Sequence, residues 1–172
     1  MKTNKLVYNL LVGVGLVLLV LPLFLSVWTY ATAVSETGYA LFTEFGDLLK
    51  ASFEVNEGGF ASFWATLTAI VGVVALAAAA LYVALFVVEL VCKKKNFASL
   101  KKLLAFVMLV CGVVALVSGI IFTSTNKVLM GEKVLYAMKM AVGFWLLVAG
   151  ALLGGLFGLL GAKTKSTSKS KR

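Results

Sequence analysis

The residues that could do chemistry in this 172-residue chain are few, and Glu89 is the main candidate. It directly follows the uncharged run from 58 to 88, and a carboxylate at the end of such a run could bind and release protons during transport. Glu89 also stands four residues before Lys93, a spacing that favours an ion pair along one helix. We expect a structural ion pair, with proton coupling by Glu89 as the alternative.

Most other catalytic chemistry is excluded by missing residue types. Histidine is absent, which excludes histidine-based acid–base catalysis, imidazole metal ligands and a Ser-His triad. The apolar runs contain no aspartate, and Cys92 and Cys111 do not form a closely spaced ligand pair. The chain also has no Gly-Lys-Ser/Thr loop for a nucleotide. We therefore expect no enzymatic activity, no metal site and no cofactor.

The charged residues fall into five blocks, at 2–5, 36–57, 89–102, 127–139 and 163–172. Four uncharged apolar runs separate these blocks, and each is long enough to cross a hydrocarbon layer of about 30 Å as a helix. Only 13% of the residues are charged, whereas soluble domains have about 25%. The sequence predicts an all-α membrane protein, a four-transmembrane-helix bundle in one domain over 1–162 with a basic tail over 163–172. The predicted spans are approximately 6–28, 60–92, 103–123 and 134–161.

Lysine and arginine residues near the span ends predict which side each loop faces. Twelve of the 16 basic residues lie in the first, third and last charge blocks, and four lie in the other two. Because basic loops are retained in the cytoplasm, we expect a multi-pass protein of the cell (plasma) membrane with both termini cytoplasmic. The basic tail should contact anionic lipids at the cytoplasmic face. We expect no nucleic-acid partner, because no folded reading element accompanies the basic residues.

The first apolar run has an alternative interpretation as a secretory signal peptide. Lys2 and Lys5 precede it, and Ala31-Thr32-Ala33 resembles a cleavage site. We favour a membrane span, because the apolar stretch is longer than the roughly 7–15 residues of a signal peptide. Pro22 lies within this run and predicts a kink in the first helix.

Small residues on three of the four predicted spans indicate where the helices pack. Helices in a membrane associate by close backbone approach, which small side chains permit. The packing residues that we predict are Gly143, Gly150, Gly154, Gly158, Gly161, Ala65, Ala69, Gly72, Ala115 and Gly119. For the Gly-rich side of the fourth span we favour contact with another span of the same chain, with contact between subunits as the alternative.

The acidic segment between the first two spans carries an apolar stripe at helical spacing, which predicts a short extracytoplasmic amphipathic helix over about 38–55. The stripe consists of Leu41, Phe42, Phe45, Leu48, Leu49 and Phe53. Three roles for this helix remain open: it lies on the membrane surface, it caps the outer mouth of the bundle, or it binds a partner.

The layout, with a longer first outer segment, a shorter second one and both termini inside, is similar to that of claudin-type tetraspan proteins. That family has two cysteines in its first outer segment, and here the segment contains none, so no residue role is carried over.

Sparse polarity within the spans favours a non-catalytic subunit or scaffold of a membrane assembly. We expect it to form a homo-oligomer, or to bind a membrane-protein partner, through the Gly-rich fourth span. A small channel or carrier, with a solute path between spans or subunits, is the alternative function.

Overall fold

The computed structural model describes residues 3–31, 36–40, 59–92, 97–125, 127–130 and 133–163. Its main elements are four long α-helices: α1 (Thr3–Val20), α3 (Gly59–Val91), α4 (Ala98–Thr125) and α5 (Val142–Lys163). Each helix is long and apolar enough to cross a membrane, which confirms the prediction of four helices with the length and composition of membrane spans. The predicted tail beyond Lys163 lies outside the described residues.

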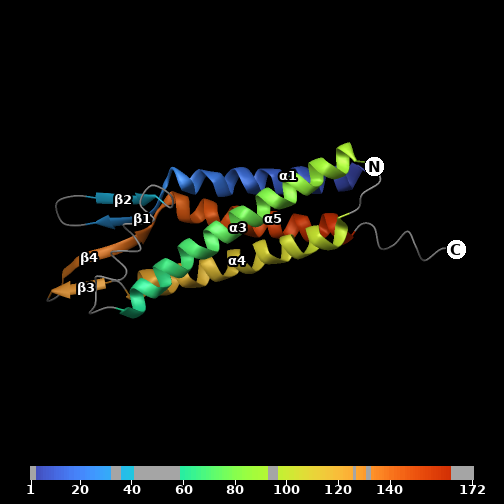
Figure 1. Cartoon of the computed structure of the whole chain (residues 1–172). Helices are drawn as coiled ribbons and strands as arrows, with labels where there is room; N and C mark the ends of the chain where they lie inside the picture. Colours follow the sequence, from blue (N-terminus) through green and yellow to red (C-terminus); the bar gives the residue numbers. More distant parts are fainter. Residues whose placement is uncertain are drawn as a thin grey trace.

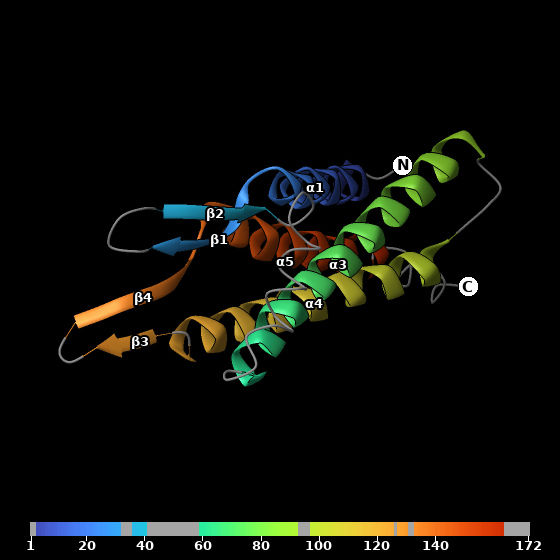
Figure 2. The same cartoon turned by 60° about the vertical axis from the view of Figure 1, so that its left-hand side comes forward.

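The helices pack as an antiparallel bundle in which α5 lies between α1 and α4 (Figure 1). Helix α3 packs mainly on α4 and runs obliquely across the bundle, as Figure 2 shows from a second side. With 33 residues α3 is about 50 Å long, and an oblique path helps so long a helix to match a hydrocarbon layer of about 30 Å. The start of α1, the end of α3, the start of α4 and the end of α5 lie together at what we call the terminus end.

The opposite end of the molecule, the sheet end, carries four short strands in the order β2-β1-β4-β3, all antiparallel (Figure 1). They are β1 (Ser26–Ala31), β2 (Glu36–Ala40), β3 (Lys127–Met130) and β4 (Lys133–Met140). Strand β1 follows α1 closely and β4 leads into α5. The two strands pair from Trp28 opposite Met140 to Ala31 opposite Ala137, so the strand pair continues the α1–α5 helix pair beyond the bundle.

The sheet was not predicted, and it changes the predicted boundaries of two helices. The fourth helix begins at Val142 rather than near 134, because residues 133–140 form β4. Residues 38–40, the predicted start of the amphipathic helix, belong to β2. Strand pairing satisfies the backbone N–H and C=O groups of these segments and overrides their local helical pattern. The apolar stripe itself, Leu41, Phe42, Phe45, Leu48, Leu49 and Phe53, lies outside the described residues.

The first helix ends earlier than predicted, and Pro22 explains where. Helix α1 stops at Val20, the short 3-10 helix η1 (Leu21–Leu23) follows, and β1 begins at Ser26, inside the predicted span 6–28. Proline lacks a backbone N–H, and its ring clashes with the carbonyl one turn earlier, which disfavours an α-helix through it. The predicted kink is therefore a helix end.

Candidate functional site

An ion pair between Glu89 of α3 and Lys101 of α4 lies at the terminus end of the bundle. Lys101 Nζ is 2.7 Å from Glu89 Oε2, and the two side chains are only 2% and 10% exposed. The other carboxylate oxygen, Glu89 Oε1, accepts the backbone N–H of Phe97 at 2.8 Å, immediately before α4 begins. A carboxylate there also complements the positive end of the α4 dipole. Glu89 therefore ties the end of α3 to the start of α4 through both of its oxygen atoms.

Glu89 has a partner, Lys101, that helical spacing did not suggest. Lys93, the expected partner, lies outside the described residues. Lys101 is 12 positions away and on the next helix, and its side chain is buried rather than facing water. The ion pair is therefore a contact between helices.

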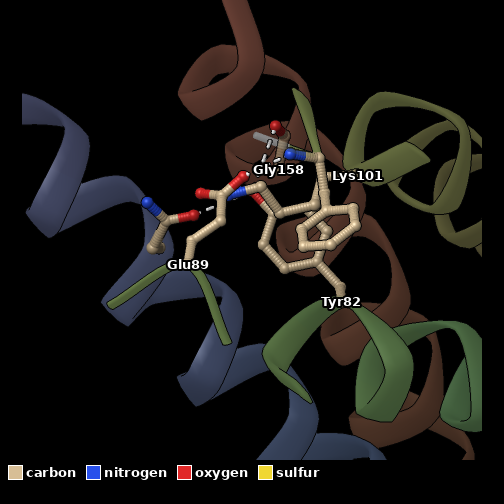
Figure 3. Close-up of polar contacts among 6 residues, drawn as sticks. Tyr82, Glu89, Lys101 and Gly158 are labelled. Carbon is tan, nitrogen blue, oxygen red and sulfur yellow. Dashed lines mark hydrogen bonds and ion pairs between the residues drawn. The ribbon is translucent and has the colours of Figure 1, made fainter. Parts of the chain in front are cut away.

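Tyr82 of α3 brings α1 and α5 into the same group of side chains (Figure 3). Its hydroxyl donates to Asn9 Oδ1 of α1 at 3.0 Å and lies 3.4 Å from the carbonyl oxygen of Gly158 on α5. Tyr82 and Asn9 are fully buried. Gly158 of α5 makes room for the phenol, since a Cβ there would lie 3.2 Å from Tyr82 Cε2, whereas a Cβ at Gly161 would be in ordinary contact with the hydroxyl at 3.5 Å.

The ammonium of Lys101 also lies over two aromatic rings of α3. Lys101 Nζ is 5.5 Å from the ring centroid of Tyr82 and 5.7 Å from that of Phe86. Aromatic faces attract a cation within about 6 Å of the centroid, so both rings add to the stabilisation that the Glu89 carboxylate supplies. We call Asn9, Tyr82, Phe86, Glu89 and Lys101 the polar cluster. It takes side chains from α1, α3 and α4, and α5 closes it through Gly158.

The arrangement of the polar cluster suits the joining of helices. A buried charge is costly unless an opposite charge and further hydrogen bonds compensate it. Here the carboxylate and the ammonium are paired, and each also meets a second group, the Phe97 N–H or an aromatic face. Each of these contacts joins α3 to α4 or to the residue just before α4, so the loss of any one of them would weaken the junction of the two helices.

A second buried polar contact joins α3 and α4 nearer the sheet end. Thr68 Oγ1 and Ser118 Oγ are 2.7 Å apart. Each hydroxyl also lies within hydrogen-bond distance of a carbonyl oxygen of its own helix, Trp64 O at 2.9 Å for Thr68 and Ala115 O at 3.1 Å for Ser118. Helices α3 and α4 are therefore joined by polar contacts at two levels.

One side of α5 lies against α1 at a glycine pair. A Cβ added at Gly150 would lie 2.8 Å from the carbonyl oxygen of Gly15, and one added at Gly15 would lie 2.9 Å from the carbonyl oxygen of Gly150. No side chain fits between these two backbones. Gly150 was singled out from the sequence, whereas Gly15 was not, because the first span has no run of small residues.

The other side of α5 lies against α4. A Cβ at Gly155 would lie 2.6 Å from the backbone nitrogen of Leu109, and one at Gly158 would lie 2.7 Å from Ala105 Cβ. Gly154 is less tight, with its nearest neighbour, Met108 Sδ, at 3.2 Å. The Gly-rich face of α5 thus contacts α1 and α4 of the same chain.

The remaining predicted packing residues lie at several places in the bundle. Gly143 lies where α5 begins, and a Cβ there would lie 2.7 Å from the carbonyl oxygen of Ser26. A Cβ at Gly119 of α4 would overlap the ring of Phe144. Ala69 and Gly72 of α3 and Ala115 of α4 are buried, and the side chain of Ala65 lies outside the described ones.

Four members of the polar cluster, Asn9, Tyr82, Phe86 and Lys101, were not predicted as site residues. Asn9 carried a usable signal, because an amide within an apolar run needs a hydrogen-bond partner when it is buried. Tyr82 carried a weaker signal, its place near the middle of the second span. Lys101 carried none, because a lysine near a span end is expected to face water.

No protein-family model, curated protein or solved structure matches this chain. Its function is therefore inferred from the polar cluster, the helix contacts and the sheet.

Proposed function

We propose that the chain is a non-catalytic, multi-pass membrane protein that acts as a scaffold or subunit of a membrane assembly. The main support is that the buried polar side chains of the described bundle contact one another or nearby backbone, as in the Glu89–Lys101 and Thr68–Ser118 contacts. Close glycine contacts add to this support, because they fix α5 against both of its neighbours. Such a bundle holds its shape, which is what a scaffold requires.

The feature that this scaffold holds is the sheet. Strands β1 and β4 continue α1 and α5, and the backbone N–H of Ala141 donates to the carbonyl oxygen of Val27 at 3.0 Å where the helices give way to strands. The Gly15–Gly150 contact fixes the same two helices within the bundle. The position of the sheet is thus determined by the helix pair beneath it, and this display of a fixed sheet is the role that we assign to the bundle.

The proposed location is the cell (plasma) membrane, with both termini in the cytoplasm and the sheet outside. The bundle itself supports a common side for the termini, because the start of α1 and the end of α5 lie at one end (Figure 1). Even without the buried Lys101, eleven of the twelve basic residues assigned to that side favour this orientation. These residues suit contact with anionic lipid headgroups.

A channel or carrier is the competing function, and the spacing of the polar groups disfavours it. Thr68 and Tyr82 are 14 positions apart on α3, which corresponds to about 21 Å along the helix. Between them the buried positions of α3 are Ala69, Gly72, Ala75, Ala78 and Ala79. Two polar levels separated by apolar packing offer solutes no continuous row of hydrogen-bonding groups.

Reconstitution and native mass spectrometry test the proposal together. Purified protein in lipid nanodiscs should appear as a defined oligomer or with a bound membrane-protein partner. Vesicles that contain the wild-type protein should dissipate a pH gradient no faster than empty vesicles, and the Glu89→Gln variant should behave in the same way. A strict monomer without a partner would contradict the assembly role. A proton flux that is present with the wild type and absent with Glu89→Gln protein shown to be folded in the vesicles would establish the carrier instead.

The part that α5 plays in assembly can be separated by substitution. If glycine contacts within the chain are the role of α5, Gly150→Leu should unfold or destabilise the monomer. If α5 instead joins subunits, the variant should remain folded and lose only its oligomeric state, which crosslinking in detergent would show.

A further inference from the structure

The carboxylate of Glu89 and the rings of Tyr82 and Phe86 surround the ammonium group of Lys101. Nζ lies 2.7 Å from Glu89 Oε2 and within 5.7 Å of both ring centroids. A carboxylate with aromatic faces is the set of groups that recognises organic ammonium ions in proteins. The side chain of Lys101 is buried, so its ammonium is held by these groups and not by bulk water.

Two of the three walls of this site are held by contacts that do not involve Lys101. Glu89 Oε1 accepts the N–H of Phe97 at 2.8 Å, which holds the carboxylate at the start of α4. The hydroxyl of Tyr82 donates to Asn9 Oδ1 at 3.0 Å, which holds the phenol ring between α1 and α5. Phe86 lies one turn after Tyr82 on the same helix and is itself largely buried. The site is therefore preorganised for its ligand, a condition that increases affinity because less ordering is required on binding.

We infer that Glu89, Tyr82 and Phe86 form a binding site for a primary ammonium group, and that Lys101 fills this site as a ligand carried by the chain itself. The site takes a linear primary alkylammonium ion when the lysine head is removed. Lys101 has a four-carbon stem, so Lys101→Ala deletes the equivalent of n-propylammonium and leaves a space of that shape. The inference does not depend on the proposed scaffold function.

Chemical rescue tests this site. Purified Lys101→Ala protein in detergent should melt at a lower temperature than the wild type, and n-propylammonium chloride should restore about half or more of the loss by binding to the folded state. Half-saturation is expected at millimolar concentrations, because so small a ligand makes few contacts. Neither n-propanol, which has the same length without the charge, nor potassium chloride should restore the melting temperature. The wild type, whose site is filled, should not respond.

Two matched variants make the result specific. Lys102→Ala changes the neighbouring lysine, which is exposed, and its melting temperature should not respond to the amine. The double variant Glu89→Gln/Lys101→Ala removes the carboxylate and should not be rescued. If Lys101→Ala is not recovered folded, the same comparison applies to the yield of monodisperse protein solubilised with and without n-propylammonium. The proposal is overturned if the amine acts equally on Lys102→Ala or on the double variant, if n-propanol or potassium replaces it, or if no condition restores Lys101→Ala.

Discussion

Gly155→Ala tests the contact between α4 and α5 with the smallest possible change. The added Cβ would lie 2.6 Å from the backbone nitrogen of Leu109, 2.7 Å from its Cβ and 2.8 Å from its Cα. Ordinary contact begins at about 3.4 Å, so the shortfall at the nitrogen is 0.8 Å. All three neighbouring atoms belong to the backbone or are bonded to it, so no side-chain rotation can relieve the overlap.

The expected cost follows from two opposing effects. Overpacking a well-packed site costs about 1–3 kcal/mol, and a rigid backbone neighbour places this substitution in the upper part of that range. Alanine gains about 0.5–1 kcal/mol over glycine within a helix, which offsets part of the cost. We expect a net loss of about 1–2 kcal/mol, equivalent to a change of roughly 5–30-fold in the ratio of folded to unfolded protein.

Gly13→Ala is the matched control for this substitution. Gly13 also lies within a long helix, but a Cβ there meets no atom within 4 Å. The helix effect should therefore act alone and stabilise the protein by about 0.5–1 kcal/mol. Unfolding in mixed micelles with increasing SDS, followed by tryptophan fluorescence, would place both variants on one scale.

The reasoning would be refuted if Gly155→Ala were as stable as Gly13→Ala. Helices α4 and α5 would then have room for a methyl group where the structure has none. Size-exclusion chromatography with light scattering should accompany the unfolding experiment. A folded Gly155→Ala variant with normal stability and an altered oligomeric state would instead assign this face of α5 to a contact between subunits.

Three further predictions concern the terminus end and the cysteines. Glu89→Gln and Lys101→Met should each lower the free energy of unfolding by about 3–5 kcal/mol, because each leaves a buried charge without its opposite charge. The double variant should lose much less. If its loss in SDS unfolding equalled the sum of the two single losses, a direct pair would be contradicted. Tyr82→Phe should cost about 1–3 kcal/mol, because it removes the hydroxyl that donates to buried Asn9. An unchanged unfolding curve would show that this bond adds nothing. In wild-type protein a membrane-impermeant maleimide should label exposed Cys92 in inside-out vesicles only. Buried Cys111 should stay unlabelled until SDS unfolds the bundle. Labelling of Cys92 in right-side-out vesicles would show that the terminus end faces outward.

The helical part of the fold could be predicted because it depends on local composition. A long uncharged apolar run specifies a membrane helix without reference to the rest of the chain, and the second and third helices begin and end within about five residues of the predicted positions. The end of the first helix has a local cause too, Pro22, which predicts a kink but in the structure ends the helix. Local rules thus locate helices better than they locate helix ends.

The sheet could not be predicted, because its strands are specified by partners far away in the sequence. Residues 133–140 continue the apolar character of the fourth span, which predicts that they form its first turns. Their pairing with β1, more than 100 positions earlier, decides otherwise, since Trp28 lies opposite Met140. Strand preference depends on such cross-strand neighbours more than on the residues themselves. The available signal is a short apolar segment in each of the two loops at the sheet end.

The polar cluster shows why charge counting alone gives an incomplete account of a membrane bundle. Lys101 was counted as one of the residues that keep its loop in the cytoplasm, yet its side chain is buried against Glu89 and two aromatic rings. Lys101 is one of twelve basic residues counted on that side, so it can enter the bundle while the other eleven still favour the same orientation. The same pair lets α4 begin at Ala98, earlier than the predicted 103, with a lysine in its first turn and a carboxylate at its positive end. A residue that sequence rules assign to topology is therefore, in the folded chain, part of what joins α3 to α4.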